Sequence, residues 1–467
     1  MYTCHFSLFR KSLVDKIGGF TVGLDGAQDY DFVMRFTELT KNIAHIPKML
    51  YHWRERVGSI ANDPEAKPYA LKAIVRLKEE SLKRQGIVGK IVYDPRVYQY
   101  RIDYEPAKKS LSLLIYGEKE NIQDFLSNMK DTKALKDIYI LDKNKYDSKI
   151  KYQQMDFTND LLTTYKNIKD KIKTSYVMFY CADNKVLTED FIDRLTGSAS
   201  LKHVGLVGAK YITEDNIIIN SGLSSSINKQ VLNGKNDLIP QYYCRNILPY
   251  NTYAVSDELM VINKEKLDNV LEKIDDLELS LGKVLIDYGY FNVVRNDVVV
   301  ISTMKKQDDQ QFIITERDPF LNLNLNYNTF MPDISSKYFR KVKKIKNIVD
   351  PKLPSLLKYK IEALKNIDSY IIRGYIFKDN FYKNNSNRVS IILKGKNNCY
   401  EVKTKKLFDQ QPTLLYKTNL NFVTFRVDLA LDKLEIDNYK VYIRIKNRLA
   451  RTEDIYDMKQ EIKMKGE

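Results

Sequence analysis

The sequence is poor in several residue types, and each shortage argues against a class of protein. Cysteine occurs only four times, and Cys4, Cys181, Cys244 and Cys399 are scattered without a CxxC pair. This pattern argues against a disulfide framework or a structural zinc site and is typical of a reducing compartment. No apolar run approaches the roughly 18–20 residues that cross a bilayer, and the N-terminal residues lack the apolar core of a signal peptide. We therefore expect a cytoplasmic protein, soluble or peripheral on the inner face of the cell membrane.

Glycine and proline are also scarce, with 18 and 12 residues, which argues against long flexible linkers. The chain has 467 residues, of which 43% are hydrophobic and 29% charged, an ordinary composition for folded globular protein. A single compact domain seldom reaches this length, so we expect two to four domains of roughly 100–200 residues each.

Basic residues and tyrosine are the abundant types. The formal net charge is +16, and such a chain can attract nucleic acid, anionic lipid or phosphorylated substrates. No DNA- or RNA-binding signature accompanies the basic residues, so we expect no nucleic-acid partner. The 33 tyrosines reflect either the base composition of the gene or rings that stack on sugars.

Strands and helices alternate through the middle of the chain. Residues 110–116 (SLSLLIY), 137–141 and 175–180 have the composition of buried strands, and helical patterns separate them. This alternation predicts an α/β domain with a mainly parallel sheet. Further strands are expected at 204–209, 252–262 and 291–301. The N-terminal region is expected to contain a strand at 4–9, helices at 11–17, 29–40 and 68–85, and an extended segment at 46–53.

The pattern changes again towards the C-terminus. Residues 335–366 are expected to be a basic helical segment, with Tyr338, Val342, Ile345 and Val349 on one helix face. Such a helix either lies on an anionic membrane surface or packs as a solvated linker on a neighbouring domain. Short strands follow from residue 369, and their spacing predicts a small all-β sandwich.

Two carboxylates, Asp29 and Asp31, are expected at the start of the helix over 29–40. A helix N-terminus stabilises anions, and a carboxylate there can accept a proton from an attacking sugar hydroxyl. The alternative is plain N-capping. His52 and Arg54 follow on the extended segment, where they either bind metal and phosphate or are structural.

The spaced segments GGF, GAQDYDFVMR, HIPKMLYHWR, GSIA and KPYA give a more specific interpretation. They resemble the second half of the catalytic domain of bacterial family-2 (GT-A type) glycosyltransferases, of the rhamnan and surface-polysaccharide branch, over about residues 4–86. The resemblance implies a nucleotide-sugar donor, Mg or Mn, and transfer with inversion to a polysaccharide or lipid-linked acceptor. It implies that Asp29 is the catalytic base and that Asp31 supports it. By the same resemblance the acceptor is bound by Gly18, Gly19, Phe20 and Gln28, and the diphosphate and metal by His52, Trp53 and Arg54.

The chain also departs from that family. The donor-binding strands and the DxD motif would precede residue 4, so the first domain is expected to lack its donor half. Residues 108–303 resemble a whole domain of the same family, carried by HVGLVGAKYITEDNIIINSG, but a degenerate one. Its DxD position falls in FYCADNKVL, where only Asp183 remains, and this is a poor Mg or Mn site. Asp275, Asp276 and Glu278 lack the spacing of the family's base motif, which indicates a pseudo-transferase.

The expected fold is therefore α/β, with a partial GT-A domain (1–105), a degenerate GT-A-like domain (106–315), a linker with a basic helix (316–366) and a C-terminal β-sandwich (367–467). The sandwich resembles modules appended to Gram-positive wall-polymer and capsule transferases. The expected function is sugar transfer to a growing cell-surface polysaccharide, with activity dependent on a donor half. The alternative is a non-catalytic glycan-binding or scaffold subunit of a polysaccharide-synthesis complex.

Overall fold

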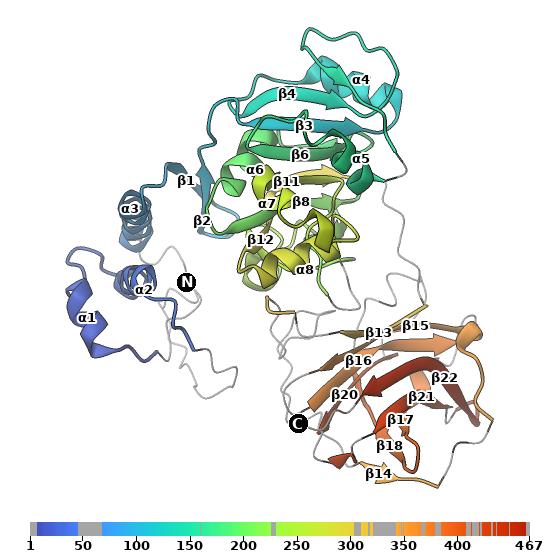
Figure 1. Ribbon diagram of the computed structural model, residues 1–467. Coiled ribbons are helices and arrows are strands. Elements are labelled where there is room, and N and C mark those ends of the chain that lie inside the picture. The colour runs from blue at the N-terminus through green and yellow to red at the C-terminus, as the bar shows by residue number, and fades with distance from the viewer. Residues whose placement is uncertain are drawn as a thin grey trace.

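The computed structural model describes residues 7–44, 68–158, 160–225, 230–302, 310–315, 318–320 and, with short gaps, 342–463. Its elements fall into three groups along the chain (Figure 1). The first is a set of helices with a hairpin, the second a large sheet flanked by helices, and the third a pair of C-terminal sheets.

The N-terminal group consists of helices α1 (Lys11–Ile17), α2 (Gln28–Leu39) and α3 (Pro68–Gln85) and of a hairpin. All three helices were predicted. Helix α1 ends because Gly18 takes a left-handed φ of 74°, which glycine adopts without steric cost. The antiparallel hairpin of β1 (Gly89–Asp94) and β2 (Gln99–Tyr104) was not predicted. Residues 7–9 lie outside any helix or strand, and residues 4–6 and 46–53 lie outside the described part.

The large sheet has ten strands, of which eight form the path β10-β12-β8-β11-β6-β3-β4-β5. β7 pairs with β12, and β9 pairs with β8. The strands are β3 (Leu111–Tyr116), β4 (Leu135–Ile140), β5 (Gln153–Gln154), β6 (Tyr176–Cys181), β7 (Lys185–Val186), β8 (Val204–Ile212), β9 (Ile218–Asn220), β10 (Tyr250–Thr252), β11 (Leu259–Asn263) and β12 (Phe291–Ile301). The half β6-β3-β4-β5 is parallel, as predicted, but β11 runs antiparallel to both of its neighbours. The sheet is therefore mixed.

Helices cover both faces of this sheet. One apolar core joins the sheet to α4 (Lys119–Asn128) and α6 (Phe191–Ala199). A second core joins the other face to α5 (Leu161–Ile168), α7 (Lys264–Asp268) and α8 (Leu279–Asp287). β3 is buried on both faces, with Leu113 in the first core and Leu114 in the second, which explains its continuous apolar sequence. The result is a three-layer α/β/α unit.

The strand order creates a crevice. From β3 the chain moves outwards to β4 and β5, and it then returns to the other side of β3 as β6. The chain thus leaves the adjacent parallel strands β3 and β6 in opposite directions. Such a topological switch point leaves a crevice at the carboxyl ends of the strands, and ligands of open α/β sheets bind there.

The C-terminal part is a sandwich of two five-stranded sheets, β13-β15-β16-β20-β19 and β14-β18-β17-β21-β22. Apolar side chains from both sheets form one core, which includes Ile361, Ile372, Ile391 and Ile443. Apart from the parallel pair β13–β15, the pairings are antiparallel. The strands are β13 (Gln310–Thr315), β14 (Lys343–Lys344), β15 (Leu357–Lys365), β16 (Ser369–Lys378), β17 (Asn387–Lys394), β18 (Cys399–Lys403), β19 (Lys405–Leu407), β20 (Thr424–Ala430), β21 (Asn438–Asn447) and β22 (Thr452–Lys463).

The basic helix predicted within 335–366 is wrong for the part that the structure describes. Lys343–Lys344 is strand β14, and Leu357–Lys365 is strand β15. In β15 alternate residues such as Leu357 and Ile361 enter the sandwich core, so the apolar period is two and not that of a helix. Ile345 packs beside a second cluster of the sandwich, which withdraws it from any lipid-facing surface.

Across the described residues, none of the helices combines the length and the apolar character that crossing a membrane requires.

Candidate functional site

The predicted acidic pair lies in the first turns of α2, beside the glycine turn. The N-cap of α2 is Ala27, so neither Asp29 nor Asp31 caps the helix, and the N-capping alternative is excluded. Asp31 is buried, with 1% of its surface exposed, and forms an ion pair with Arg35 at 2.7 Å. Its Oδ2 also accepts a hydrogen bond from the Thr21 hydroxyl at 2.6 Å. Asp31 is therefore neutralised within its own helix.

Arg35 connects this pair to the glycine turn. Its guanidinium donates to the carbonyl oxygens of Ile17 and Gly19, each at 2.7 Å, while Nε donates to Asp31. Gly18 and Gly19 both have positive φ, which a larger side chain would strain. The arginine thus fixes the path of the turn relative to α2.

The other residues of the predicted acceptor site remain open to solvent. Phe20 is 64% exposed, although its ring lies 4.9 Å from that of Phe32, and Gln28 is exposed at the start of α2. Asp29 is half-buried, and its Oδ1 accepts the backbone N–H of Tyr30 at 2.8 Å. The structure therefore brings Gly18, Gly19, Phe20, Asp29 and Asp31 together around one turn. His52, Trp53 and Arg54 lie outside the described residues.

Asp183 lies at the switch point of the large sheet, just after the carboxyl end of β6. Its Oδ1 accepts the backbone N–H of Glu118 and the side-chain amide of Asn121, both at 2.8 Å. Glu118 is the N-cap of α4, so Asp183 joins the end of β6 to the loop that follows β3. Gly117 makes this approach feasible, because a Cβ there would lie 2.8 Å from Asp183 Oδ1. Asp183 itself is exposed.

Three further carboxylates gather near Asp183. Asp257 and Glu258 precede β11, and Glu278 is the N-cap of α8. The Glu258 carboxylate accepts the amide of Asn184 at 2.8 Å. Burial, followed by the charges of Glu278 and Glu258, raises the pKa of Asp257 to about 7. Burial likewise raises the pKa values of Glu258 and Glu278. No cation is named among the main causes of these shifts, so the group stores unbalanced acidity.

Sequence reasoning identified Asp183 but missed Asp257 and Glu258, and it set Glu278 aside for its spacing. These residues reach the crevice because β11 runs antiparallel to β6, which places the turn before β11 beside the end of β6. The available signal was the DE pair just before an apolar strand, at a position where most strands begin without charge.

The donor set does not fit a Mg or Mn site. Hard divalent ions need several oxygen ligands, and Asp183 Oδ1 already accepts two hydrogen bonds. Cys181 occupies the place of a first aspartate, and within the described ranges no group of three or more His, Cys, Asp or Glu side chains is arranged to hold a metal ion.

The two acidic groups are separate in the fold. Helix α2 lies at the left of Figure 1, away from α4 and α5, which lie near the carboxyl ends of β3 and β6. For the residues that the structure describes, no hydrogen bond or ion pair is recorded between Asp29 or Asp31 and Asp183.

The sequence matches no protein-family model. It is 26% identical over 325 residues to the uncharacterized protein y4gI of Sinorhizobium fredii, an alignment that covers 62% of this chain and 36% of that protein. It is 25% identical over 240 residues to the O-antigen biosynthesis protein RfbC of Myxococcus xanthus, which covers 48% of this chain and 19% of that one. The chain thus spans about a third and a fifth of the length of these relatives.

Solved structures give weaker likenesses. A mannosyltransferase from Pyrobaculum calidifontis, in complex with GDP-mannose and Mn²⁺, matches at a TM-score of 0.31 and 13% identity, covering 52% of this chain and 68% of the other. The protein A197 from STIV matches at a TM-score of 0.25 and 10% identity, covering 40% and 83%. Scores of this size carry no argument about function.

Proposed function

We propose that this chain takes part in the transfer of sugar units from nucleotide-sugar donors to a cell-surface polysaccharide. The observation that carries the proposal is the sequence similarity to an O-antigen biosynthesis protein over 240 residues. The crevice between β3 and β6 supports it, because this is where open α/β sheets bind their ligands.

In this proposal the donor occupies the β3–β6 crevice. Asp183 is exposed there and is held by Glu118 and Asn121. Tyr116 at the end of β3 stacks on Phe157 with ring centroids 5.8 Å apart, and Phe157 is 45% exposed. An exposed ring beside polar groups fits a ligand with a flat base and a polar sugar.

The chemistry requires a carboxylate that removes a proton from the attacking hydroxyl while the new C–O bond forms and the nucleoside diphosphate leaves. A base works best when its pKa lies near the working pH, and Asp257 has a pKa of about 7. Asp29 is the base that the family resemblance implies for the N-terminal group, and it belongs to this proposal as well. Because the donor set does not fit a metal, no step is assigned to one.

The test is a titration of the full chain with GDP-mannose, UDP-glucose and dTDP-rhamnose, with Mg²⁺, with Mn²⁺ and with EDTA. Binding is followed by calorimetry and turnover by release of the nucleoside diphosphate. We expect Asp183→Asn to weaken binding about tenfold, the size of one lost charge-assisted contact. Asp215→Asn, an exposed aspartate in a turn after β8, is the matched control. Equal donor binding by Asp183→Asn and the wild-type chain would remove the crevice from the proposal.

The second candidate is a non-catalytic glycan-binding or scaffold subunit. It is favoured by the single aspartate at the position of the DxD motif and by the C-terminal sandwich, which occupies about a quarter of the chain. The same titration separates the candidates: donor binding with turnover supports the transferase, and donor binding without turnover supports the subunit.

A further inference from the structure

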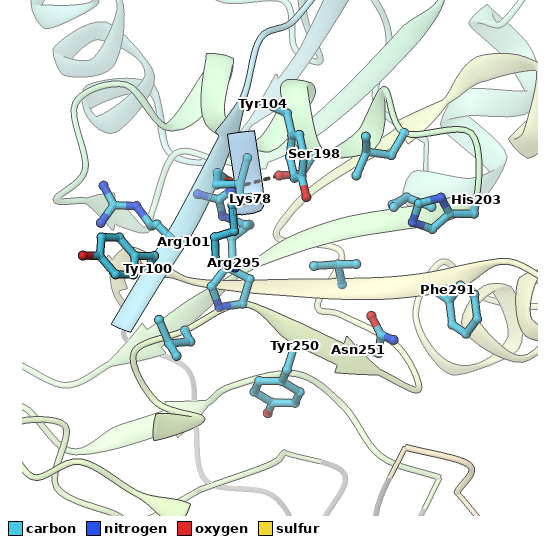
Figure 2. Close-up of a pocket in the computed structure, with 16 residues that line it drawn as sticks. Lys78, Tyr100, Arg101, Tyr104, Ser198, His203, Tyr250, Asn251, Phe291 and Arg295 are labelled. Atoms are coloured by element: carbon cyan, nitrogen blue, oxygen red, sulfur yellow. Dashed lines mark hydrogen bonds between the residues drawn. The ribbon is translucent and has the colours of Figure 1, made fainter. Parts of the chain in front are cut away.

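A second cavity lies at the opposite edge of the large sheet, where β8 and β12 begin. It has a volume of about 410 Å³ and opens between the β1–β2 hairpin, the end of α6 and β10 (Figure 2). Small-molecule sites in proteins span about 300–1,000 Å³, so the cavity is large enough for a ligand.

Aromatic rings and neutral polar groups share the lining. The rings are those of Tyr100, Tyr104, Tyr250 and Phe291, and Figure 2 shows them around the cavity with Asn251. Phe291 is 41% exposed, and Asn251 is exposed. Rings that offer an apolar face beside hydrogen-bonding groups suit ligands with both apolar and hydroxylated surfaces.

The charges of the lining are balanced from behind. The guanidinium of Arg295 is 1% exposed and pairs with Asp297 at 2.7 Å and with Asp103. Arg101 pairs with Asp297 at 3.2 Å and also with Asp103. Burial lowers the pKa of His203, which is therefore neutral at pH 7. The cavity consequently presents little free positive charge, and a phosphate group would gain little there.

The cavity continues into a smaller one of about 270 Å³. The two share Leu201, and the smaller is lined by Tyr176, Asn263, Asn269 and Tyr290. The two together form one elongated groove that follows the amino edge of the sheet. Its length favours a chain of several units over a single compact molecule.

The groove is built from rigid parts. Gly197 in α6 lets β2 approach so closely that a Cβ there would lie 1.9 Å from the carbonyl oxygen of Tyr104. Arg295 also donates to the carbonyl oxygen of Ile102 at 3.1 Å and to Ser198 at 2.8 Å. The hairpin is thereby fixed against the α/β unit, and a pre-formed site loses less entropy on binding.

We propose that this groove binds a segment of a neutral oligosaccharide. Sugar rings combine apolar C–H faces with many hydroxyl groups, which matches tyrosine and phenylalanine rings interleaved with asparagine and serine. Balanced arginines exclude a dependence on phosphate. The site is distinct from the β3–β6 crevice and does not require catalysis there.

The test uses the full chain and short oligosaccharides released by mild acid from the cell-surface polysaccharide of the organism that makes this protein. Binding is measured by saturation-transfer NMR and calorimetry. We expect Phe291→Ala and Asn251→Ala each to weaken binding about three- to tenfold, as the loss of one ring or amide contact predicts. The matched control is Tyr288→Ala, an aromatic residue that is 51% exposed and outside the lining of both cavities.

Oligosaccharide binding that both groove variants weaken and the control leaves unchanged supports the proposal. No binding by the wild-type chain overturns it, and so does binding that the groove variants leave intact. Inorganic pyrophosphate is a parallel probe, and competition by it for the groove would also overturn the assignment to a neutral ligand. Loss of donor binding in Asp183→Asn without a change in oligosaccharide binding would separate this inference from the proposed function.

Discussion

Two groups of carboxylates in this chain are held by opposite means. Asp31, at the start of α2, is buried but paired with Arg35 and hydrogen-bonded by Thr21. Asp257, before β11, is buried beside Glu258 and Glu278, and their charges add to the burial that raises its pKa. The first group has a matching cation and the second lacks one among its principal neighbours.

The difference separates structural from functional acidity. A carboxylate neutralised by an arginine contributes to stability and keeps its proton off at neutral pH. Carboxylates crowded together without a cation destabilise the fold, and such groups are concentrated at functional sites. On this criterion the β3–β6 crevice is a stronger candidate for proton transfer than Asp31.

The largest effect is expected from breaking the matched pair. Asp31→Asn leaves the Arg35 guanidinium without its anion in a largely buried position, and such a loss costs about 3–5 kcal/mol. Hydrogen exchange of the α2 backbone amides and urea denaturation would measure it. Asp25→Asn, an exposed neighbour in the same turn region, is the control and should change stability by less than about 0.5 kcal/mol. If both variants behave alike, the Asp31–Arg35 pair is not a structural element.

The unmatched group should respond to pH in the opposite direction. The pKa of Asp257 is about 7 in the native state, against 3.8 ordinarily, so the native state keeps a proton that the unfolded chain releases between these values. Stability therefore falls as the pH rises from about 4 to about 7 and then levels off. Asp257→Asn should remove this part of the fall and be more stable than the wild-type chain at pH 8 by about 2–3 kcal/mol. Denaturation at pH 5 and pH 8 tests this, and a variant less stable at pH 8 would contradict it.

Local sequence signals predicted elements that local interactions define. Helix α3 was predicted with its observed bounds, because Pro68 starts it and Gly86 follows it. The apolar run of β3 identified a strand buried on both faces. By contrast, β15 was mistaken for helix, because its alternation lies within a lysine-rich stretch whose basic character drew more attention than its period.

The crevice was harder to predict, because it depends on strand order. Asn184 bonds Glu258, which is 74 positions further along the chain, and this contact exists only because β11 inserts antiparallel between β6 and β8. Spacing within one segment contains no information about such an insertion. The sequence located Asp183 by its motif, whereas its acidic neighbours came from the topology.

A smaller effect is expected at the junction between the two regions. Alanine in place of a helical glycine normally stabilises a helix by about 1 kcal/mol. Gly197→Ala should instead destabilise the chain by about 1–3 kcal/mol, since its Cβ would meet the Tyr104 carbonyl at 1.9 Å. Hydrogen exchange in β2 would report the loosened hairpin. Gly282→Ala also meets backbone and side-chain atoms but lies in α8, away from the hairpin, so it should destabilise the chain without exposing β2. Protection of β2 that Gly197→Ala leaves unchanged would mean that the hairpin does not depend on this contact.

The smallest effect on stability is expected at Asp29, the neighbour of Asp31. Asp29 is half-buried and accepts only the adjacent Tyr30 amide in the described structure, so Asp29→Asn should change the free energy of unfolding by less than about 0.5 kcal/mol. If Asp29 is the base that the family resemblance implies, the same variant should lower sugar transfer about a hundredfold, the lower range for a lost general base. Transfer rate and urea midpoint, measured on one preparation, separate the two effects. An unchanged transfer rate would assign the proton-accepting role to the β3–β6 crevice, where Asp257 would then be the residue to replace.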